Sequence, residues 1–224
     1  MDDNSESFET KNEDIMLQEI KRISSELSHD LRGPLQIIRN CTYLLKLDPG
    51  DVSPTEDIDN AVSKIIDMLN NFREYYKASE ISQYAMDFNP IMEQALGEVV
   101  IPDKVKVNYS FDSDIGEVSI DPVKMKKSLY YLIKTAVDSM PDGGNLAVET
   151  SNNAQSIKII ISDTGDAIPE SQRKDILKPF GSKNRESTGL ALPSCGLVIK
   201  AHGGTIDFTS GEAGTTFTVT LPKQ

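Results

Sequence analysis

Residues 28–35 read Ser28-His29-Asp30-Leu31-Arg32-Gly33-Pro34-Leu35 and lie inside a long amphipathic pattern. Around them, mostly apolar side chains recur at spacings of three and four residues, which is the period of one helix face. The pattern predicts one long helix that starts near Met16 and ends at the breaker segment 48–51. Its stripe consists of Met16, Ile20, Ile23, Leu27, Leu31, Leu35, Ile38, Thr42 and Leu45.

A second stripe follows the breaker and predicts a second long helix. Pro54 and Thr55 suit its start, and Glu56 and Asp57 favour its first turn because negative charge is stabilising there. Two long helices joined by a short loop predict an antiparallel hairpin. One hairpin cannot cover its own seam, so we expect a second copy to complete a four-helix bundle, which makes the protein a homodimer. The second stripe consists of Ile58, Ala61, Ile65, Met68, Phe72 and Tyr75.

The chain beyond Ser79 changes to a mixed pattern of strands and helices. Two helices are predicted, over 121–140 and 189–202, and Gly203-Gly204 closes the second. Alternation and turn residues predict strands over 104–111, 145–151, 156–162, 205–209 and 215–221. The fold class is therefore a helical hairpin followed by an α+β sandwich with a mostly antiparallel sheet. We expect three parts: an acidic disordered tail over 1–14, the hairpin over 15–80 and the α+β domain over 81–224.

Composition limits the possible partners. The formal net charge is -12, which argues against nucleic acid or an anionic membrane as the main partner. No apolar run approaches the ~20 residues that a membrane span needs, so we expect a cytoplasmic protein. Cys41 and Cys195 lie within apolar helical patterns and are expected to be buried and reduced.

His29 is the first candidate for chemistry. It is rotated by about 200° from Leu27 on the helix, so it points away from the apolar stripe. A surface histidine alone is usually only solvated, but Asp30 follows it and Pro34 lies one turn beyond. A proline inside a helix costs about 3 kcal/mol, which favours a site over a plain scaffold. Neutral imidazole is a nucleophile, and Asp30 can accept a proton from one of its ring nitrogens.

The segment 28–35 resembles the phosphoacceptor box of two-component histidine kinases. The resemblance implies that His29 takes the γ-phosphoryl group of ATP, that Asp30 assists as base, and that an aspartate of a response regulator receives the group. Members that also dephosphorylate their partner often carry Thr or Asn four residues after the histidine. Here that residue is Gly33, so we expect weak phosphatase activity.

A second set of candidates follows the strand predicted over 156–162. Asp163-Thr164-Gly165 places a carboxylate and a glycine turn at a strand end, although such a tripeptide alone is often an ordinary turn. Gly189 begins a predicted helix, where backbone N–H groups and the helix dipole favour phosphate. Lys183 and Arg185 can supply cations to phosphates.

In this order, the motifs resemble the nucleotide boxes of the histidine kinase ATPase domain. The resemblance implies that Asp163 binds the adenine amine and that Mg²⁺ is held at Thr135, where the family usually has asparagine. His202 is interpreted as structural, at a helix end where a cation is favoured. The residues expected around ATP are Asp163, Gly165, Lys183, Thr188, Gly189, Leu190 and Thr135.

Three substitutions keep other readings open. Thr135, Ala167 and Ala191 stand where the family has an asparagine and two glycines. They allow an ATP-independent phosphotransferase that relays phosphate through His29, or a pseudokinase that acts as a dimeric scaffold. The intact box at 28–35 argues against a scaffold, and the retained nucleotide residues favour an ATP-dependent protein histidine kinase.

Overall fold

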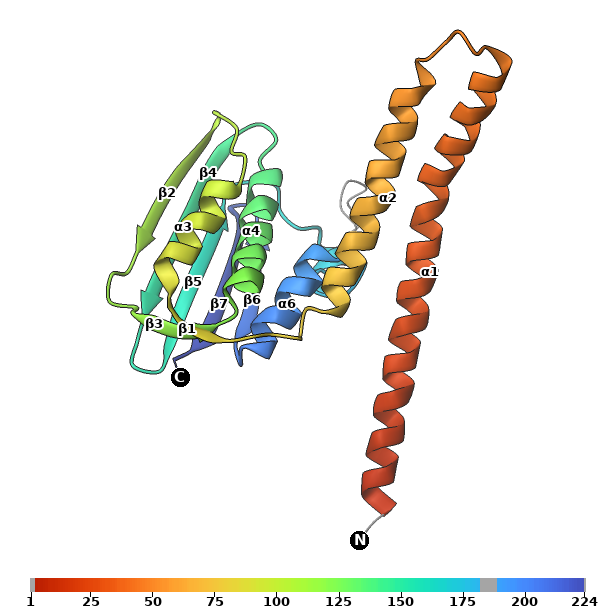
Figure 1. Ribbon diagram of the computed structural model, residues 1–224. Coiled ribbons are helices and arrows are strands. Elements are labelled where there is room, and N and C mark those ends of the chain that lie inside the picture. Colours follow the sequence, from red (N-terminus) through yellow and green to blue (C-terminus); the bar gives the residue numbers. More distant parts are fainter. Residues whose placement is uncertain (1–2, 182–188, 224) are drawn as a thin grey trace. The chain divides into compact units, whose positions relative to one another are not determined.

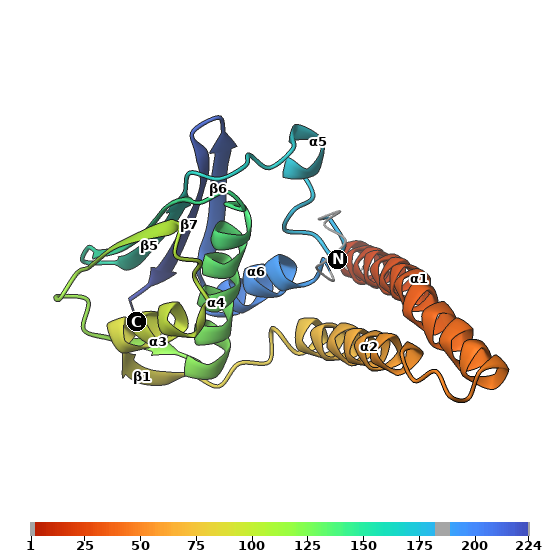
Figure 2. The same cartoon turned by 90° about the horizontal axis from the view of Figure 1, so that it is seen from above.

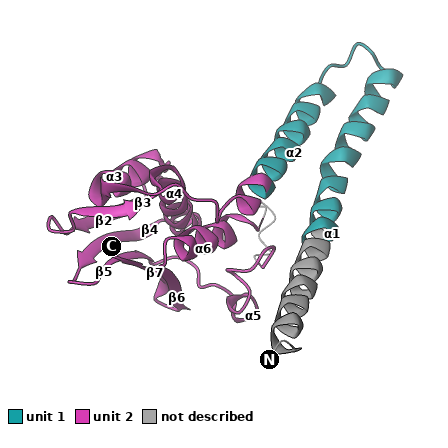
Figure 3. Cartoon of the chain, turned by 60° about the horizontal axis from the view of Figure 1, so that its bottom comes forward, with its two compact units in different colours: residues 1–72 teal, residues 73–224 magenta. Residues whose placement is uncertain are grey.

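The computed structural model describes residues 3–181 and 189–223, with the side chains of residues 3–22 and Glu26 outside that description. The chain forms two compact units, Met1–Phe72 and Arg73–Gln224 (Figure 3). The division falls inside the second helix, a little before the boundary expected near residue 80. Among the described residues, none of the helices is both long and apolar enough to span a bilayer.

The first unit is the predicted helical hairpin. Helix α1 spans Asp3–Leu47 and helix α2 begins at Pro54 and ends at Tyr76 (Figure 1). In the loop, Asp48 Oδ1 accepts a hydrogen bond from Gly50 N at 3.0 Å, so an Asx turn reverses the chain. Helix α1 continues through Pro34 and extends back beyond Met16. The acidic disordered tail over 1–14 stays a prediction because its side chains are not described.

The hairpin buries only part of its apolar surface. Cys41 of α1 and Ala61 and Met68 of α2 are buried, whereas a second set of large apolar side chains is exposed. These exposed apolar side chains make the hairpin a candidate for contact with another protein surface. The exposed set comprises Leu35, Ile37, Tyr43, Leu44, Leu47, Val52, Val62, Ile66 and Leu69.

The second unit is built on a five-stranded sheet with the order β2-β4-β5-β7-β6. Only the β2–β4 pair is parallel; the other three pairs are antiparallel, as the sequence predicts. The strands are β2 (Val105–Phe111), β4 (Gly144–Asn152), β5 (Ser156–Asp163), β6 (Thr205–Gly211) and β7 (Gly214–Pro222).

Three helices cover one face of this sheet (Figures 1 and 2). They are α3 (Phe88–Glu98), α4 (Pro122–Asp138) and α6 (Ala191–Ala201). Helix α4 is central, and its Leu129, Leu132 and Ile133 are fully or almost fully buried against the sheet's apolar face. Cys195 of α6 is also buried, and burial raises the pKa of its thiol to about 12, which keeps it an unreactive, reduced side chain.

Four short elements are absent from the expectations. Strands β1 (Tyr84–Asp87) and β3 (Glu117–Ile120) pair antiparallel as a separate two-stranded sheet. Helix α5 is only Glu170–Arg173. Helix α3 has a stripe of Phe88, Ile91, Met92 and Ala95, all buried, and Asp87 caps its first turn. Strands of four residues show too little alternation to be recognised, whereas α3 carries a readable helical stripe.

His202 joins the end of α6 to the start of α4. Its Nε2 accepts a hydrogen bond from the Asp121 backbone N–H at 2.8 Å, and its Nδ1 lies 2.7 Å from Val198 O. A ring nitrogen that accepts from a backbone N–H carries no proton, so Nδ1 is the donor and the ring is neutral. The buried ring with two hydrogen-bonded nitrogens supports the structural interpretation of His202, and Lys200 supplies a cation in the last turn of α6.

Candidate functional site

His29 lies on the surface of α1 with its side chain 76% exposed. Asp30 Oδ1 lies 3.3 Å from His29 Nδ1, at the long end of hydrogen-bond range. If Nδ1 carries the ring proton and donates it to Asp30, the lone pair of Nε2 is free to attack an electrophile. The exposed position predicted from helical phase is confirmed, and the pair suits nucleophilic chemistry.

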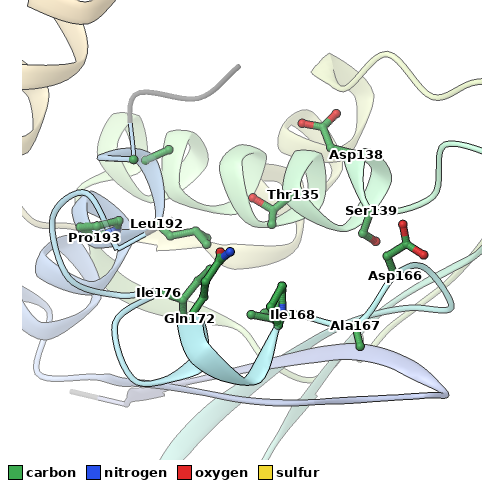
Figure 4. A pocket seen from close by; sticks show the side chains of 13 residues that line it. Thr135, Asp138, Ser139, Asp166, Ala167, Ile168, Gln172, Ile176, Leu192 and Pro193 are labelled. Carbon is green, nitrogen blue, oxygen red and sulfur yellow. The ribbon is translucent and has the colours of Figure 1, made fainter. Parts of the chain in front are cut away.

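A pocket in the second unit brings together segments far apart in the sequence (Figure 4). Thr135 and Ser139, at the end of α4, form one wall, and Ile168 and Gln172 lie opposite. Gly189 and the first turn of α6 complete it. The full lining is Thr135, Asp138, Ser139, Asp166, Ala167, Ile168, Pro169, Gln172, Ile176, Gly189, Ala191, Leu192 and Pro193.

Asp163 ends β5 close to Ser139, but it is not among the residues that line the pocket, and only 4% of the residue is exposed. Its Oδ1 accepts hydrogen bonds from Gly165 N at 2.9 Å and, more weakly, from Thr215 N at 3.3 Å. Among the described residues, Oδ2 has no hydrogen-bond partner. Burial raises the pKa of the Asp163 carboxyl, and hydrogen bonds from Gly165, Ser139 and Thr215 partly oppose the shift. A buried, unpaired acceptor is suited to a ligand that brings a donor.

Two glycines allow the backbone to close around Asp163. A Cβ on Gly165 would overlap Ser139, both at its hydroxyl and at its carbonyl. Gly214 has φ +111, and a Cβ there would overlap the carbonyl of Asp163. Asp166 N also donates to Ser139 O at 2.8 Å, which ties the turn to the end of α4. The glycine predicted at 165 is therefore required by packing against α4.

Thr135 occupies the pocket wall where a metal ligand is expected. Its Oγ1 donates to Tyr131 O at 2.8 Å, which leaves the hydroxyl lone pairs as possible ligands. Asp138, one turn on, is paired with Lys134, whose Nζ lies 2.8 Å from each carboxylate oxygen. The described residues contain no group of three or more His, Cys, Asp or Glu side chains arranged to hold a metal ion. Any cation here would therefore take most of its ligands from the phosphates and water, as Mg²⁺ often does.

The segment between α5 and α6 is closed at its base. Phe180 N donates to Gly189 O at 2.9 Å, so a backbone hydrogen bond joins Phe180 to the residue just before Leu190. Phe180 has φ 58 and Gly189 has φ 64, both in the left-handed region. Leu190 is buried directly before α6 and does not line the pocket. The expected residues Lys183 and Thr188, with Arg185, lie outside the described part of the chain.

The two alanines that replace family glycines need no special backbone. In the described part of the chain, Phe180 is the sole non-glycine residue with a positive φ, so Ala167 and Ala191 adopt ordinary conformations. Both line the pocket, where their methyl groups narrow it without straining the chain.

Sequence reasoning missed the residues that position Asp163. Ser139 and Thr215 act on its carboxyl group, although they belong to α4 and β7. Thr215 also exchanges a hydrogen bond with Ser210 at 2.8 Å, and Ser210 accepts from Ile168 N. The glycine at 214 next to a threonine was the available signal, but its partner across the sheet could not be read from the chain.

Comparisons with known proteins agree with this geometry. Residues 120–224 match the family described as histidine kinase-, DNA gyrase B-, and HSP90-like ATPase. The sensor histidine kinase ZraS of Escherichia coli (strain K12) is 26% identical over 210 residues, which are 89% of this chain and 45% of that protein. Sporulation kinase C of Bacillus subtilis (strain 168) is 28% identical over 206 residues, 89% of this chain and 48% of that protein.

Solved structures share the fold. Histidine kinase ThkA, in its complex with the response regulator protein TrrA, matches with a TM-score of 0.78 at 20% identity, covering 98% of this chain and 66% of that one. Acinetobacter baumannii histidine kinase AdeS matches with a TM-score of 0.68 at 21% identity, covering 88% of this chain and 98% of that one.

The matched region is only part of each relative. This chain spans about half the length of ZraS and of sporulation kinase C. The likeness to histidine kinase catalytic cores that the motifs predict is confirmed. Residues 120–224 match the histidine kinase-, DNA gyrase B- and HSP90-like ATPase family, and most of the chain is similar in sequence to sensor histidine kinases.

Proposed function

We propose that this protein is an ATP-dependent protein histidine kinase that phosphorylates His29 and passes the phosphoryl group to an aspartate of a response regulator. The observation that carries the proposal is the exposed His29–Asp30 pair in a chain that also holds an ATPase-family domain. Neither part alone requires this activity, because an ATPase domain needs no exposed histidine on a separate hairpin.

The hairpin residues supply the nucleophile. With Nδ1–H directed to Asp30, Nε2 attacks the γ-phosphorus, the new N–P bond forms, and the bond to the bridging oxygen breaks as ADP leaves. Asp30 stabilises the positive charge that develops on the ring and takes the Nδ1 proton. When the phosphoryl group passes to an aspartate, the N–P bond breaks and Asp30 returns the proton to Nδ1, which restores neutral His29. Such transfers depend mainly on positioning and charge stabilisation.

Three features of the pocket and its surroundings suit a nucleotide. The free Oδ2 of Asp163 can accept a hydrogen bond from an exocyclic amine, and Ile168, Ile176 and Leu192 supply apolar surface for a flat base. Gly189 places backbone next to the start of α6, where phosphate is favoured. Lys183 and Thr188 are proposed to act on the phosphates, and Gly165 and Leu190 to shape the backbone around the nucleotide.

Mg²⁺ is proposed at Thr135, where the hydroxyl provides one oxygen ligand next to the phosphates. When bound, the ion neutralises charge on the transferring group. Thr135 is a shorter and weaker ligand than the asparagine of the family, and Asp138 is already paired with Lys134. We therefore expect weaker dependence on Mg²⁺ than an asparagine would give.

The hairpin is proposed to dimerise into a four-helix bundle. The exposed apolar residues on α1 and α2, Leu44 and Ile66 among them, give each hairpin a surface that a second copy can cover. The receiver domain of a response regulator is the proposed phosphoryl acceptor, in a cytoplasmic setting. The net charge of -12 supports neither nucleic acid nor an anionic membrane as a partner.

The proposal is tested with γ-labelled ATP and Mg²⁺. The wild-type chain should acquire a label that is labile to acid and stable to base, and His29→Ala should acquire none while binding ATP normally. Asp30→Asn keeps the shape of the base without its charge, so labelling should slow by roughly 100-fold or more.

Other outcomes select the alternatives. Nucleotide binding without label would indicate a pseudokinase scaffold. A chain that neither binds nucleotide nor takes label from ATP, yet accepts label from a phosphorylated receiver domain, would be an ATP-independent phosphotransferase.

A further inference from the structure

The Asp163 carboxylate is incompletely satisfied in a way that involves its neighbour on α4. Oδ1 accepts from Gly165 N and Thr215 N, whereas Oδ2 has no partner among the described residues. An ionised oxygen in this position costs free energy, because burial removes water and no donor replaces it. A hydrogen-bond donor that reaches Oδ2 would therefore remove this cost.

Ser139 is the hydroxyl-bearing residue placed to act on this carboxylate from the pocket side. It follows the last residue of α4, lines the pocket and packs so closely on Gly165 that a Cβ there would overlap its hydroxyl. Gly165 N is itself the strongest donor to Asp163. In Figure 4, Ser139 lies on the wall between Thr135 and Asp166.

The Ser139 hydroxyl has one hydrogen, and it can donate that hydrogen either to Ala136 O or to the Asp163 carboxyl group, on which it already acts. In this structure Oγ donates to Ala136 O at 2.8 Å. A hydrogen bond to an ionised oxygen is roughly twice as strong as one to a neutral carbonyl. Turning the hydroxyl from Ala136 O to the carboxylate is therefore favourable whenever the pocket allows it.

We propose that Ser139 is a positioning residue for Asp163: the Ser139 hydroxyl hydrogen alternates between Ala136 O and the Asp163 carboxylate, and it stays on the carboxylate while a nucleotide base is bound. The inference rests on the proposed function, since it assumes that Asp163 reads an exocyclic amine. Ser139 keeps the carboxylate ionised and oriented, so that Oδ2 accepts from the base.

The electrostatic surroundings support this role. Burial raises the pKa of Asp163, and hydrogen bonds from Gly165, Ser139 and Thr215 lower it. No charged side chain of the described residues contributes to the shift. The acidic groups of the pocket wall are Asp138 and Asp166, and Lys134 neutralises the first of them. Loss of the Ser139 donor should therefore raise the pKa of Asp163 further.

The test measures ATP affinity of the full chain by titration calorimetry, with Mg²⁺, across acidic to neutral pH. Wild-type affinity should fall as the pH drops through the pKa of Asp163, because the neutral acid is a poorer acceptor. In Ser139→Ala the fall should begin at higher pH, and affinity at pH 7 should be roughly threefold to tenfold weaker. Asp163→Asn should bind weakly and without this acid limb.

Ser128→Ala is the matched control. Ser128 also lies on α4 and donates to the backbone one turn back, at 2.9 Å to Lys124 O, but it is not in the pocket. It should leave the acid limb of ATP binding in place. If Ser139→Ala folds poorly by circular dichroism, Ser139→Cys replaces it, since a thiol keeps the volume and is a weak donor.

The outcomes separate the two proposals. If the wild type binds ATP and Asp163→Asn does not, but Ser139→Ala or Ser139→Cys keeps the wild-type acid limb, the role of Ser139 is overturned and the kinase proposal stands. Equal weakening at every pH would also overturn it, because that is the effect of a merely structural residue. A wild type that binds no ATP overturns the ATP-dependent function together with this inference.

Discussion

His29 and Asp163 are the central residues of the two units, and their surroundings are opposite. His29 is 76% exposed and its partner is the next residue in the chain. Asp163 is 4% exposed, and one of its donors, Thr215, is 52 residues away in sequence. The first site is a local feature of a helix surface, whereas the second exists only after strands β5 and β7 and helix α4 have packed.

This difference in burial predicts how substitutions at each site affect activity and stability. A change at an exposed helical position alters what the surface does and hardly alters folding, since surface substitutions usually stay within about 0.5 kcal/mol. A change at a packed site affects both, because each buried polar group there has its partner in another element. The chain contains matched residue pairs, one in each unit, that test this contrast.

The two histidines give the largest expected contrast in stability. His202→Ala leaves the buried Asp121 N–H unpaired, at a cost of about 1–3 kcal/mol, and also removes a buried ring, while Val198 O keeps its bond from the backbone N–H of residue 202. We expect His202→Ala to lose roughly 2–4 kcal/mol, and His29→Ala less than about 0.5 kcal/mol. Urea unfolding followed by circular dichroism measures both. Equal losses would show that burial does not distinguish the two residues.

Two glycines give the next contrast. Gly165→Ala forces a methyl group into Ser139 and should cost about 1–3 kcal/mol, with weaker ATP binding. Gly33→Ala meets nothing within 4 Å and removes a glycine from the interior of α1. It should stabilise the hairpin by about 0.5–1 kcal/mol. Thermal unfolding of both variants compares them, and a stable, ATP-binding Gly165→Ala would contradict the close packing.

The ionisation of Asp163 should be visible in stability without nucleotide. Since burial raises its folded pKa, its contribution to stability is fully present below the unfolded pKa near 3.8 and is lost as pH rises through the folded pKa. Asp163→Asn lacks this loss, so the variant should gain on the wild type as pH rises, by on the order of 1 kcal/mol. Urea unfolding at pH 4 and pH 7 gives the difference. A constant difference between the proteins would mean that Asp163 does not titrate in this range.

Much of the architecture follows from periodicity. The hairpin, α4, α6 and the five strands of the main sheet are all predicted, because their stripes and alternation are long and turns bound them. Strands β1 and β3 are too short to show a pattern, and their pairing joins distant segments. Helix α3, in contrast, carries a helical stripe in its sequence, from Phe88 to Ala95.

The sites differ in the same way. His29 and Asp30 can be predicted from the sequence because both lie on one helix turn, and the helical period alone predicts that the His29 side chain is exposed. Asp163 and Gly165 can be predicted from their motif. The role of Ser139 can be recognised only in the folded structure, where the end of α4 contacts the turn over 163–166. Backbone angles, which the sequence does not give, show that Ala167 and Ala191 do not adopt the left-handed conformation that favours glycine.

Thr135 offers the smallest expected effect, since it stands where the family that the sequence resembles usually has asparagine. Thr135→Asn supplies an amide oxygen with longer reach, so ATP affinity in the presence of Mg²⁺ should rise by roughly threefold to tenfold. Thr135→Val keeps the shape and removes the hydroxyl, so the gain in ATP affinity that Mg²⁺ provides should shrink below that of the wild type.

With the metal chelated, the wild type and the two Thr135 variants should bind ATP alike. Because Thr135 Oγ1 bonds only its own helix at Tyr131 O, neither change should disturb the fold by more than about 1 kcal/mol. If the order Asn, Thr, Val does not appear in the Mg²⁺ dependence, the metal is held elsewhere, and the difference between this pocket and its relatives' lies outside Thr135.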